Sequence, residues 1–295
     1  MLPGVKAASL ALLAFLVVAA GASAQAGATR RDGRVLFVPL ATSTEYAPYA
    51  VIRAVDPVTG RVTTIAPGHN IDTENPTPSP DGRSLAFTRG QQHGTAARGL
   101  FAADADGRHA RRISKIAGIW PTWSPDGSRL AYVGHGVVVL HADGSHVRRL
   151  PIAGDEMQVA WSSGNQLVIS HMLESPLLQL VRPDGSGLRT LRRGQPGDAF
   201  VNPKWSPDGR RIIYEHWTGC GGSFCSGGPG IEIADLRGNV VRSLGDGDYP
   251  TFSPSGTSIA YATGDGVFIR SLADGSTRQI FNGSLETGGI GWQAR

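Results

Sequence analysis

One pattern of twelve residues recurs along the chain and constrains the fold more than any other feature. In its clearest copy, residues 121–132, a tryptophan precedes Ser-Pro-Asp-Gly, and an apolar, a small and an aromatic residue follow. Ser-Pro-Asp-Gly favours a tight turn because proline presets φ, aspartate bonds its own backbone and glycine accepts a positive φ. Apolar and polar residues alternate on both sides, which predicts two short strands. One copy therefore predicts a β-hairpin.

The copies are spaced like the blades of a β-propeller. Further full copies occupy residues 76–87, 203–214 and 250–261, and a degenerate copy at 159–169 lacks the Pro-Asp pair. The glycines that we assign to the turns are Gly82, Gly127, Gly164, Gly209 and Gly256. Their separations of 45, 37, 45 and 47 residues match the length of a four-stranded propeller blade.

A second turn, of the Asp-Gly type, falls between consecutive copies and reveals how the chain closes. It occurs at residues 56–60, 106–107, 143–144, 184–185, 235–238 and 274–275. These six turns outnumber the five copies of the first pattern, but the chain ends supply the missing copy: residues 32–37 resemble its tail and residues 291–293 its leading strand. We therefore predict an all-β fold, a six-bladed β-propeller of four-stranded antiparallel blades. Residues 32–295 would form one domain, closed by N- and C-terminal strands that leave no open sheet edge.

The repeated Trp-Ser-Pro-Asp-Gly-x-x-(Ile/Leu)-Ala-(Tyr/Phe) pattern resembles the repeat of TolB-like six-bladed β-propellers. The resemblance covers nearly the whole chain after residue 32 and is specific for the fold rather than for a function, because similar blades serve binding proteins and enzymes alike. TolB, after which the family is named, carries a separate domain before its propeller. We expect that domain to be absent here.

The N-terminus predicts export. Lys6, an apolar run at residues 7–21 and a small-residue site at 22–24 are typical of a signal peptide cleaved after Ala24. Residues 25–31 would be a short linker, and the mature protein, periplasmic or secreted, would not insert stably in a membrane. The alternative is an uncleaved anchor, for which the apolar run is short. In an oxidising compartment Cys220 and Cys225 are expected to form a disulfide, since a metal site would need more ligands than this segment offers.

The basic residues do not predict a nucleic-acid partner, although the net charge is +4. Five arginines each stand two residues before the apolar residue of a predicted outermost strand: Arg111, Arg148, Arg189, Arg242 and Arg278. Charge there opposes edge-to-edge association and forms no continuous groove for phosphates. The residue before each Ser-Pro-Asp-Gly turn is expected to pack between blades, giving a column of Pro78, Trp123, Trp161, Trp205, Phe252 and Trp292.

Both sets of turns fall on one face of the ring, here called the turn face. The connections on the opposite face, here called the variable face, lead into the innermost strands and should crowd the mouth of the central channel. Acidic residues are frequent in them: Asp72, Glu74, Asp155, Glu156, Asp198, Asp246, Asp248 and Glu286. An acidic mouth favours a cation or a basic partner segment. The alternative is that Asp simply suits polar turns.

No Gly-x-Ser-x-Gly elbow, His-Glu-x-x-His helix or phosphate loop occurs in the sequence. We therefore predict a monomeric, non-enzymatic propeller without a cofactor that binds a protein or peptide partner across the variable face. Its predicted contacts are Trp120, Tyr249, Trp217, Asn75, Asn202, Asp72, Glu74, Glu156 and Asp248. The alternative is a polysaccharide lyase or hydrolase with a funnel active site. His171 and His216 occupy equivalent positions and are the candidate metal ligands, but no third histidine joins them, so no metal is predicted.

Overall fold

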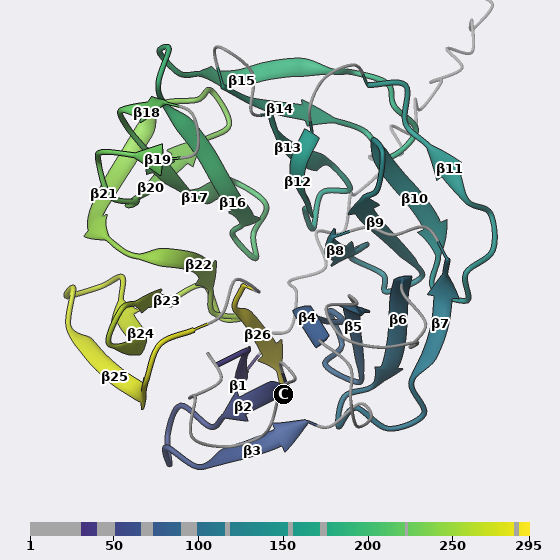
Figure 1. Cartoon of the computed structure of the whole chain (residues 1–295), viewed down its shortest axis with the longest axis horizontal. Coiled ribbons are helices and arrows are strands. Elements are labelled where there is room, and N and C mark those ends of the chain that lie inside the picture. The colour runs from purple at the N-terminus through teal and green to yellow at the C-terminus, as the bar shows by residue number, and fades with distance from the viewer. Residues whose placement is uncertain are drawn as a thin grey trace, which may run out of the picture.

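Each copy of the repeat forms the two inner strands of one antiparallel sheet, and six such sheets surround a central channel (Figure 1). This computed structural model describes residues 31–39, 51–65, 73–89, 99–115, 119–152, 156–171, 176–221, 224–285 and 289–295. The predicted all-β, six-bladed fold is confirmed. The predicted signal peptide lies outside the described residues, as does the linker except for Arg31. The described residues contain no helix that is long and apolar enough to cross a membrane.

The blades are numbered here in chain order, with strands given from the channel outward. Blade 1 contains β26 (Gly291–Ala294), β1 (Asp32–Phe37), β2 (Ile52–Val55) and β3 (Val62–Ile65). Blade 2 contains β4 (Thr73–Pro78), β5 (Ser84–Arg89), β6 (Gly99–Asp104) and β7 (Arg111–Ser114). Blade 3 contains β8 (Ile119–Trp123), β9 (Arg129–Val133), β10 (Val137–His141) and β11 (Arg148–Arg149).

The second half of the ring follows the same order and carries one insertion. Blade 4 contains β12 (Glu156–Trp161), β13 (Leu167–His171), β14 (Leu177–Val181) and β15 (Arg189–Arg193). Blade 5 contains β16 (Ala199–Trp205), β17 (Arg211–Trp217), β20 (Gly230–Asp235) and β21 (Val240–Asp246). A small hairpin, β18 (Cys220–Gly221) with β19 (Phe224–Cys225), is inserted between β17 and β20. Blade 6 contains β22 (Asp248–Phe252), β23 (Ser258–Thr263), β24 (Gly266–Ser271) and β25 (Thr277–Asn282).

Blade 1 closes the ring with strands from both ends of the chain. The C-terminal β26 pairs antiparallel with β1, with Trp292 opposite Val35 and Gly291 opposite Leu36. Trp292 thereby takes the place before the turn that a tryptophan occupies in blades 3, 4 and 5. The predicted completion of a sixth copy by the two termini is confirmed.

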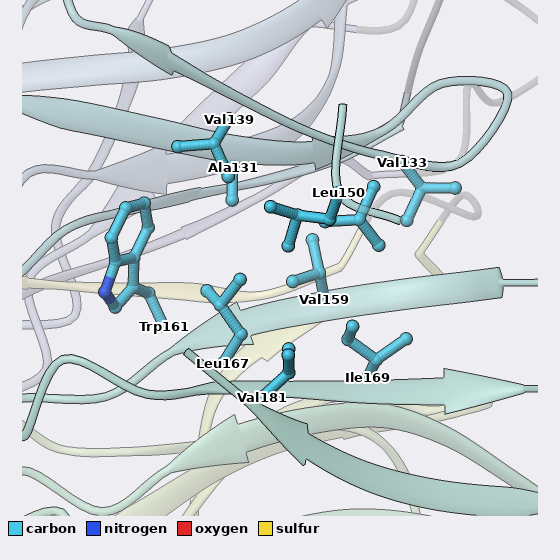
Figure 2. Packing of buried hydrophobic residues seen from close by; sticks show 10 residues of the cluster. Ala131, Val133, Val139, Leu150, Val159, Trp161, Leu167, Ile169 and Val181 are labelled. Carbon is cyan, nitrogen blue, oxygen red and sulfur yellow. The ribbon is translucent and has the colours of Figure 1, made fainter. Parts of the chain in front are cut away.

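The hydrophobic core is divided into six clusters, one between each pair of neighbouring blades. Successive side chains of a strand point to opposite sheet faces, so Leu36 packs toward blade 2 while Val35 packs toward blade 6. Figure 2 shows the cluster between blades 3 and 4, where Trp161 lies beside Leu167 and across from Ala131. Trp123, Trp205, Phe252 and Trp292 take part in the other clusters. Packing of these aromatic residues between blades is therefore confirmed.

The five rim arginines also link neighbouring blades, which the sequence did not predict. Each side chain donates to a backbone carbonyl in the outer turn of the next blade. The acceptors are Ala142 for Arg111, Asp184 for Arg148, Leu236 for Arg189, Leu272 for Arg242 and Pro57 for Arg278. The guanidinium groups reach across the gap between adjacent turns, a role in addition to the edge charge expected from the sequence.

The Ser-Pro-Asp-Gly turns form as expected in three copies, where the serine hydroxyl donates to the aspartate. The Oγ–Oδ1 distances are 2.5 Å for Ser79–Asp81, 2.5 Å for Ser124–Asp126 and 2.6 Å for Ser206–Asp208. The degenerate copy differs from our assignment. Asn165 rather than Gly164 adopts the positive φ, of 57°, and donates its amide to the Ser162 carbonyl, three residues after the turn serine as Gly82 is after Ser79. The residue that this copy lacks comes after Asn165, since Ser162 pairs with Gln166 whereas Ser79 pairs with Ser84.

Candidate functional site

The innermost strands share an unusual backbone conformation on the side of the variable face. Four non-glycine residues adopt a left-handed φ three positions before the column residue: Asn75 at 55°, Trp120 at 60°, Asn202 at 53° and Tyr249 at 53°. Gly289 occupies the corresponding position before β26, with φ of 78°. These five residues are called the left-handed ring below. Their non-glycine members are all among the contacts predicted from sequence.

A β-bulge accompanies the left-handed residue in blades 2, 3, 5 and 6. The register shifts between Glu74 and Thr77, and again between Val201 and Lys204, for example. A proline follows each of the four non-glycine members and has no amide hydrogen that would lack a partner. A left-handed residue with a side chain costs about 1–3 kcal/mol and persists where the surroundings fix it, often at functional sites. Bulges also redirect side chains, so the ring is a candidate site on physical grounds.

Trp120 and Tyr249 contact residues of other blades. Trp120, from blade 3, is half-buried and its ring lies against Gly289 of blade 1: a Cβ placed on Gly289 would be 3.3 Å from Cζ3. Tyr249 is half-buried against the cluster between blades 6 and 1. Its backbone amide donates to the Glu215 Oε1 of blade 5 at 2.6 Å. Both aromatic residues thus join blades at the channel mouth.

Glu215 is the centre of a buried polar network that the sequence did not reveal. The side chain is 2% exposed and accepts hydrogen bonds from Asn202 Nδ2 at 2.5 Å and from Trp217 Nε1 at 2.9 Å, besides the Tyr249 amide. Gln158 of blade 4 extends the network, because its Nε2 donates to Asn202 Oδ1 at 2.8 Å. Three predicted contact residues therefore converge on one carboxyl group.

Burial changes the acidity of the carboxyl groups at this site. It raises the pKa of Glu215 to about 7, against the opposing effect of its three donors. The pKa of the half-buried Asp248 is also raised by burial, and Asp248 contributes to the raised pKa of Glu215. A basic group arriving at the mouth would favour the ionised forms of both carboxyls.

The predicted acidic mouth is described only in part. Glu74 is half-buried at the start of blade 2, and Asp246 lies in the outermost strand of blade 5. Asp72, Asp155 and Glu286 lie outside the described residues, and for Glu156 only the backbone in β12 is described. Attraction of a basic segment to this mouth stays a prediction.

The two candidate metal ligands have different surroundings. His216 lies within blade 5, with Nδ1 3.2 Å from Glu232 Oε1 and Nε2 3.5 Å from Asp198 Oδ2. His171 is buried in β13, opposite Glu156 and Leu177 in the neighbouring strands. In the described part of the chain, no group of three or more histidine, cysteine or acidic residues is placed to hold a metal ion.

The inserted hairpin is bonded to the connection that leads into the innermost strand of blade 5. Cys220 and Cys225 form the expected disulfide, with an S–S distance of 2.00 Å. The Cys220 amide donates to the Gly197 carbonyl at 2.6 Å, in the connection that leads into β16. A hydrogen bond therefore joins the disulfide-linked hairpin to this connection on the variable face.

A cavity lies at the end of the channel that opens on the turn face. This cavity of about 210 Å³ is lined by the column residues Trp123, Trp161, Trp205, Phe252 and Trp292, together with the prolines of the turns. The aromatic residues pack between blades and are only 7–9% exposed. The cavity therefore follows from the repeat itself.

The fold and its repeat define the class first: the chain is a six-bladed β-propeller closed by both termini. No family model matches the sequence. The Tol-Pal system protein TolB of Bordetella pertussis is 35% identical over 150 residues, which cover 47% of this chain and 32% of that protein. The chain thus matches about a third of the length of the curated relatives.

Solved structures agree with this assignment of the fold. TolB from Acinetobacter baumannii superposes with a TM-score of 0.72 at 17% identity, over 88% of this chain and 66% of that one. A putative TolB from Agrobacterium tumefaciens superposes with a TM-score of 0.62 at 16% identity, over 91% of this chain and 99% of that one. The chain is a TolB-like six-bladed β-propeller, a distant homologue of TolB.

Proposed function

We propose that this protein is an exported, non-enzymatic propeller that binds a protein or peptide segment across its variable face. The observation that carries the proposal is the left-handed ring, whose strained backbone is held in place around the channel mouth by contacts between blades. The similarity to a protein described as part of the Tol-Pal system is compatible with a role in an assembly of proteins.

The contacts of a bound segment follow from the chemistry of the mouth. Trp120, Tyr249 and Trp217 are half-buried aromatic residues, the type that most often supplies binding energy at protein interfaces. Hydrogen bonds and packing already hold these residues, so little ordering is needed on binding. Asp248 and Glu74 would attract basic groups, and a basic partner segment is therefore part of the proposal.

The disulfide supports the proposed location. A disulfide between Cys220 and Cys225 persists in the periplasm or outside the cell rather than in a reducing cytoplasm. We propose that the segment before residue 25 directs export and that the mature protein acts there as a monomer.

The decisive experiment is recovery of a partner by the mature protein, residues 25–295, from a crosslinked envelope or secreted fraction. We expect a specific partner with the unaltered protein and its loss with Trp120→Ala and with Tyr249→Ala. Val147→Ala is the matched control, because Val147 is an exposed apolar residue that precedes the outermost strand of blade 3. Thermal unfolding of each variant verifies that it is folded. Equal recovery with all variants would refute the proposed face.

Metal analysis tests the enzymatic alternative. The proposal expects no stoichiometric divalent metal in the purified mature protein. Stoichiometric metal that disappears in His171→Ala and in His216→Ala would instead favour a lyase or hydrolase.

A further inference from the structure

Lys204 is a basic residue inside the channel that neither the predicted contacts nor the proposed function uses. It precedes the column residue Trp205 in the innermost strand of blade 5. At the same position the other blades carry short, uncharged residues: Thr77, Thr122, Ala160, Thr251 and Gly291. Two of the three threonines bond to the following blade: Thr77 Oγ1 donates to the Pro121 carbonyl at 2.8 Å, and Thr122 Oγ1 accepts from the Trp161 amide at 3.1 Å.

The lysine side chain is longer and lines a cavity deep to the left-handed ring. Three members of that ring, Asn75, Trp120 and Gly289, form part of its wall. The remaining lining residues are Pro76, Thr77, Pro121 and Ile290. These residues belong to blades 1, 2 and 3, so Lys204 extends from blade 5 toward the far side of the channel. The cavity therefore lies directly below the proposed binding face.

The Lys204 amine has no counter-charge among the described residues. None of the other seven lining residues is charged, and no described carboxylate forms an ion pair with it. Burial lowers its pKa to about 8, so most molecules carry the charged form at pH 7. Lys204 is half-buried, so its charge is partly withdrawn from water, and an anion that pairs with it offsets that cost.

The size of the cavity selects among anions. Its volume is about 10 Å³, which admits about one water-sized group. One oxygen of a slender, planar carboxylate fits this description, whereas the tetrahedral phosphate and sulfate ions are bulkier. Trp120 and the two prolines wall the cavity without offering charged donors of their own, so Lys204 is the residue that would recognise the anion.

We propose that Lys204 binds one carboxylate group, from an acidic side chain or the C-terminus of the segment that occupies the variable face. This proposal deepens the proposed function and rests on it. A charge-assisted N–H···O bond between an ammonium and a carboxylate is about twice as strong as a neutral one. The partner segment would then carry a carboxylate that enters the channel and basic groups that remain near Asp248 and Glu74.

The lysine content of the chain allows a direct test. Lys6, Lys115 and Lys204 are its lysines, so mature protein labelled with ¹³C-lysine gives two side-chain signals, and exposed Lys115 is an internal control. We expect sodium formate, titrated against sodium chloride at constant ionic strength, to shift the Lys204 Cε signal saturably. The pKa of Lys204, which burial lowers to about 8, should rise. Lys204→Met should lose the shifting signal, and Lys115→Met should retain it.

Two results would overturn the proposal: no saturable response of Lys204 to formate, or equal responses to formate, chloride and sulfate. Recovery of the partner by a Lys204 variant shows whether the bound carboxylate belongs to the partner or to a free small molecule. We expect Lys204→Met, once a thermal unfolding measurement has shown that it is folded, to lower partner recovery at least tenfold. Unchanged recovery would limit the site to free carboxylates and refute the link to the partner. If Trp120→Ala abolishes recovery while Lys204 ignores formate, the proposed function stands and this inference fails. If Lys204 responds to formate but Trp120→Ala recovers the partner normally, the proposed function fails instead.

Discussion

The two faces of the ring use the same repeat in opposite ways. On the turn face the Ser–Asp bonds recur from blade to blade, and rim arginines clamp successive turns. On the variable face the backbone is strained, a carboxyl group is buried and one blade carries a disulfide-linked hairpin. The repeated contacts on the turn face stabilise the fold. This stability allows the variable face to keep a strained backbone and a buried carboxyl group. The following experiments test this division.

The largest effect is expected from opening the ring. Deletion of residues 291–295 removes β26 and with it Trp292 from the cluster between blades 6 and 1. Because β1 would then have an unpaired inner edge, we expect unfolding in urea to lose its cooperativity. Circular dichroism measures this unfolding. Deletion of Arg295 alone is the control, since it removes an exposed ion pair with Asp56 and one backbone hydrogen bond to the Arg31 carbonyl but leaves β26 in place. Equal cooperativity of both truncations would show that closure is dispensable.

The second effect concerns the buried carboxyl group of the variable face. Glu215 has its pKa raised from 4.5 to about 7, so the folded state binds more protons than the unfolded state between these values. The contribution of this residue to stability is therefore fully present below pH 4.5 and is lost as the pH rises to about 7, a change of roughly 3 kcal/mol.

Glu215→Gln cannot ionise and should flatten this pH dependence, measured as the free energy of urea unfolding from pH 5 to 8. Asp235→Asn on the turn face is a comparison variant, because the pKa of Asp235 is lowered by hydrogen bonds rather than raised. A slope that is the same for Glu215→Gln and for the unaltered protein would contradict the assignment.

The third effect measures one clamp of the rim. Arg242 Nη1 donates to the Leu272 carbonyl at 2.7 Å in a partly buried position. Replacement by methionine should lower the free energy of unfolding by about 1.5 kcal/mol, the scale of a hydrogen bond to a charged group. Arg237→Met, an exposed residue of the same blade, should change stability by less than about 0.5 kcal/mol. Equal changes would mean that the arginines act as edge charges after all.

The smallest effect tests strain in the left-handed ring. Trp120→Gly and Trp120→Ala both remove the indole, but only alanine keeps a Cβ at φ of 60°. The glycine variant should be more stable by about 0.5–1 kcal/mol in thermal unfolding, and both should lose the partner. The same pair at Val147 provides the reverse control, because Val147 has no positive φ and glycine should there be the less stable replacement. Greater stability of Trp120→Ala would refute strain at this position.

The fold was predictable because neighbouring residues within each copy of the repeat determine its turns and strands. Turn residues, alternation and spacing determine each blade, and residues 32–37 with 291–293 are sufficient to indicate the closure. The one misplaced turn position, Gly164, arose because asparagine replaces glycine at the left-handed position, Asn165, while a glycine stands one residue earlier.

The site was predictable only in part. Trp120, Tyr249, Asn75 and Asn202 each stand directly before the proline that opens a copy of the repeat, and the structure finds them in one conformation within the innermost strands. Glu215 and Lys204 could not be found in this way. Their surroundings come from other blades, and a single charged residue in an alternating strand predicts a solvent-facing side chain. The rim arginines show the same limit, since their acceptors belong to the next blade.

Closure by β26 has a kinetic consequence. The pairing of Leu36 with Gly291 joins residues almost at opposite ends of the described chain, and contacts of such long sequence separation form slowly. Gly289, against which Trp120 packs, is brought into place by the same strand. We therefore expect the mouth of the channel to be among the last parts to assemble, so that only molecules whose two ends have met can capture a partner.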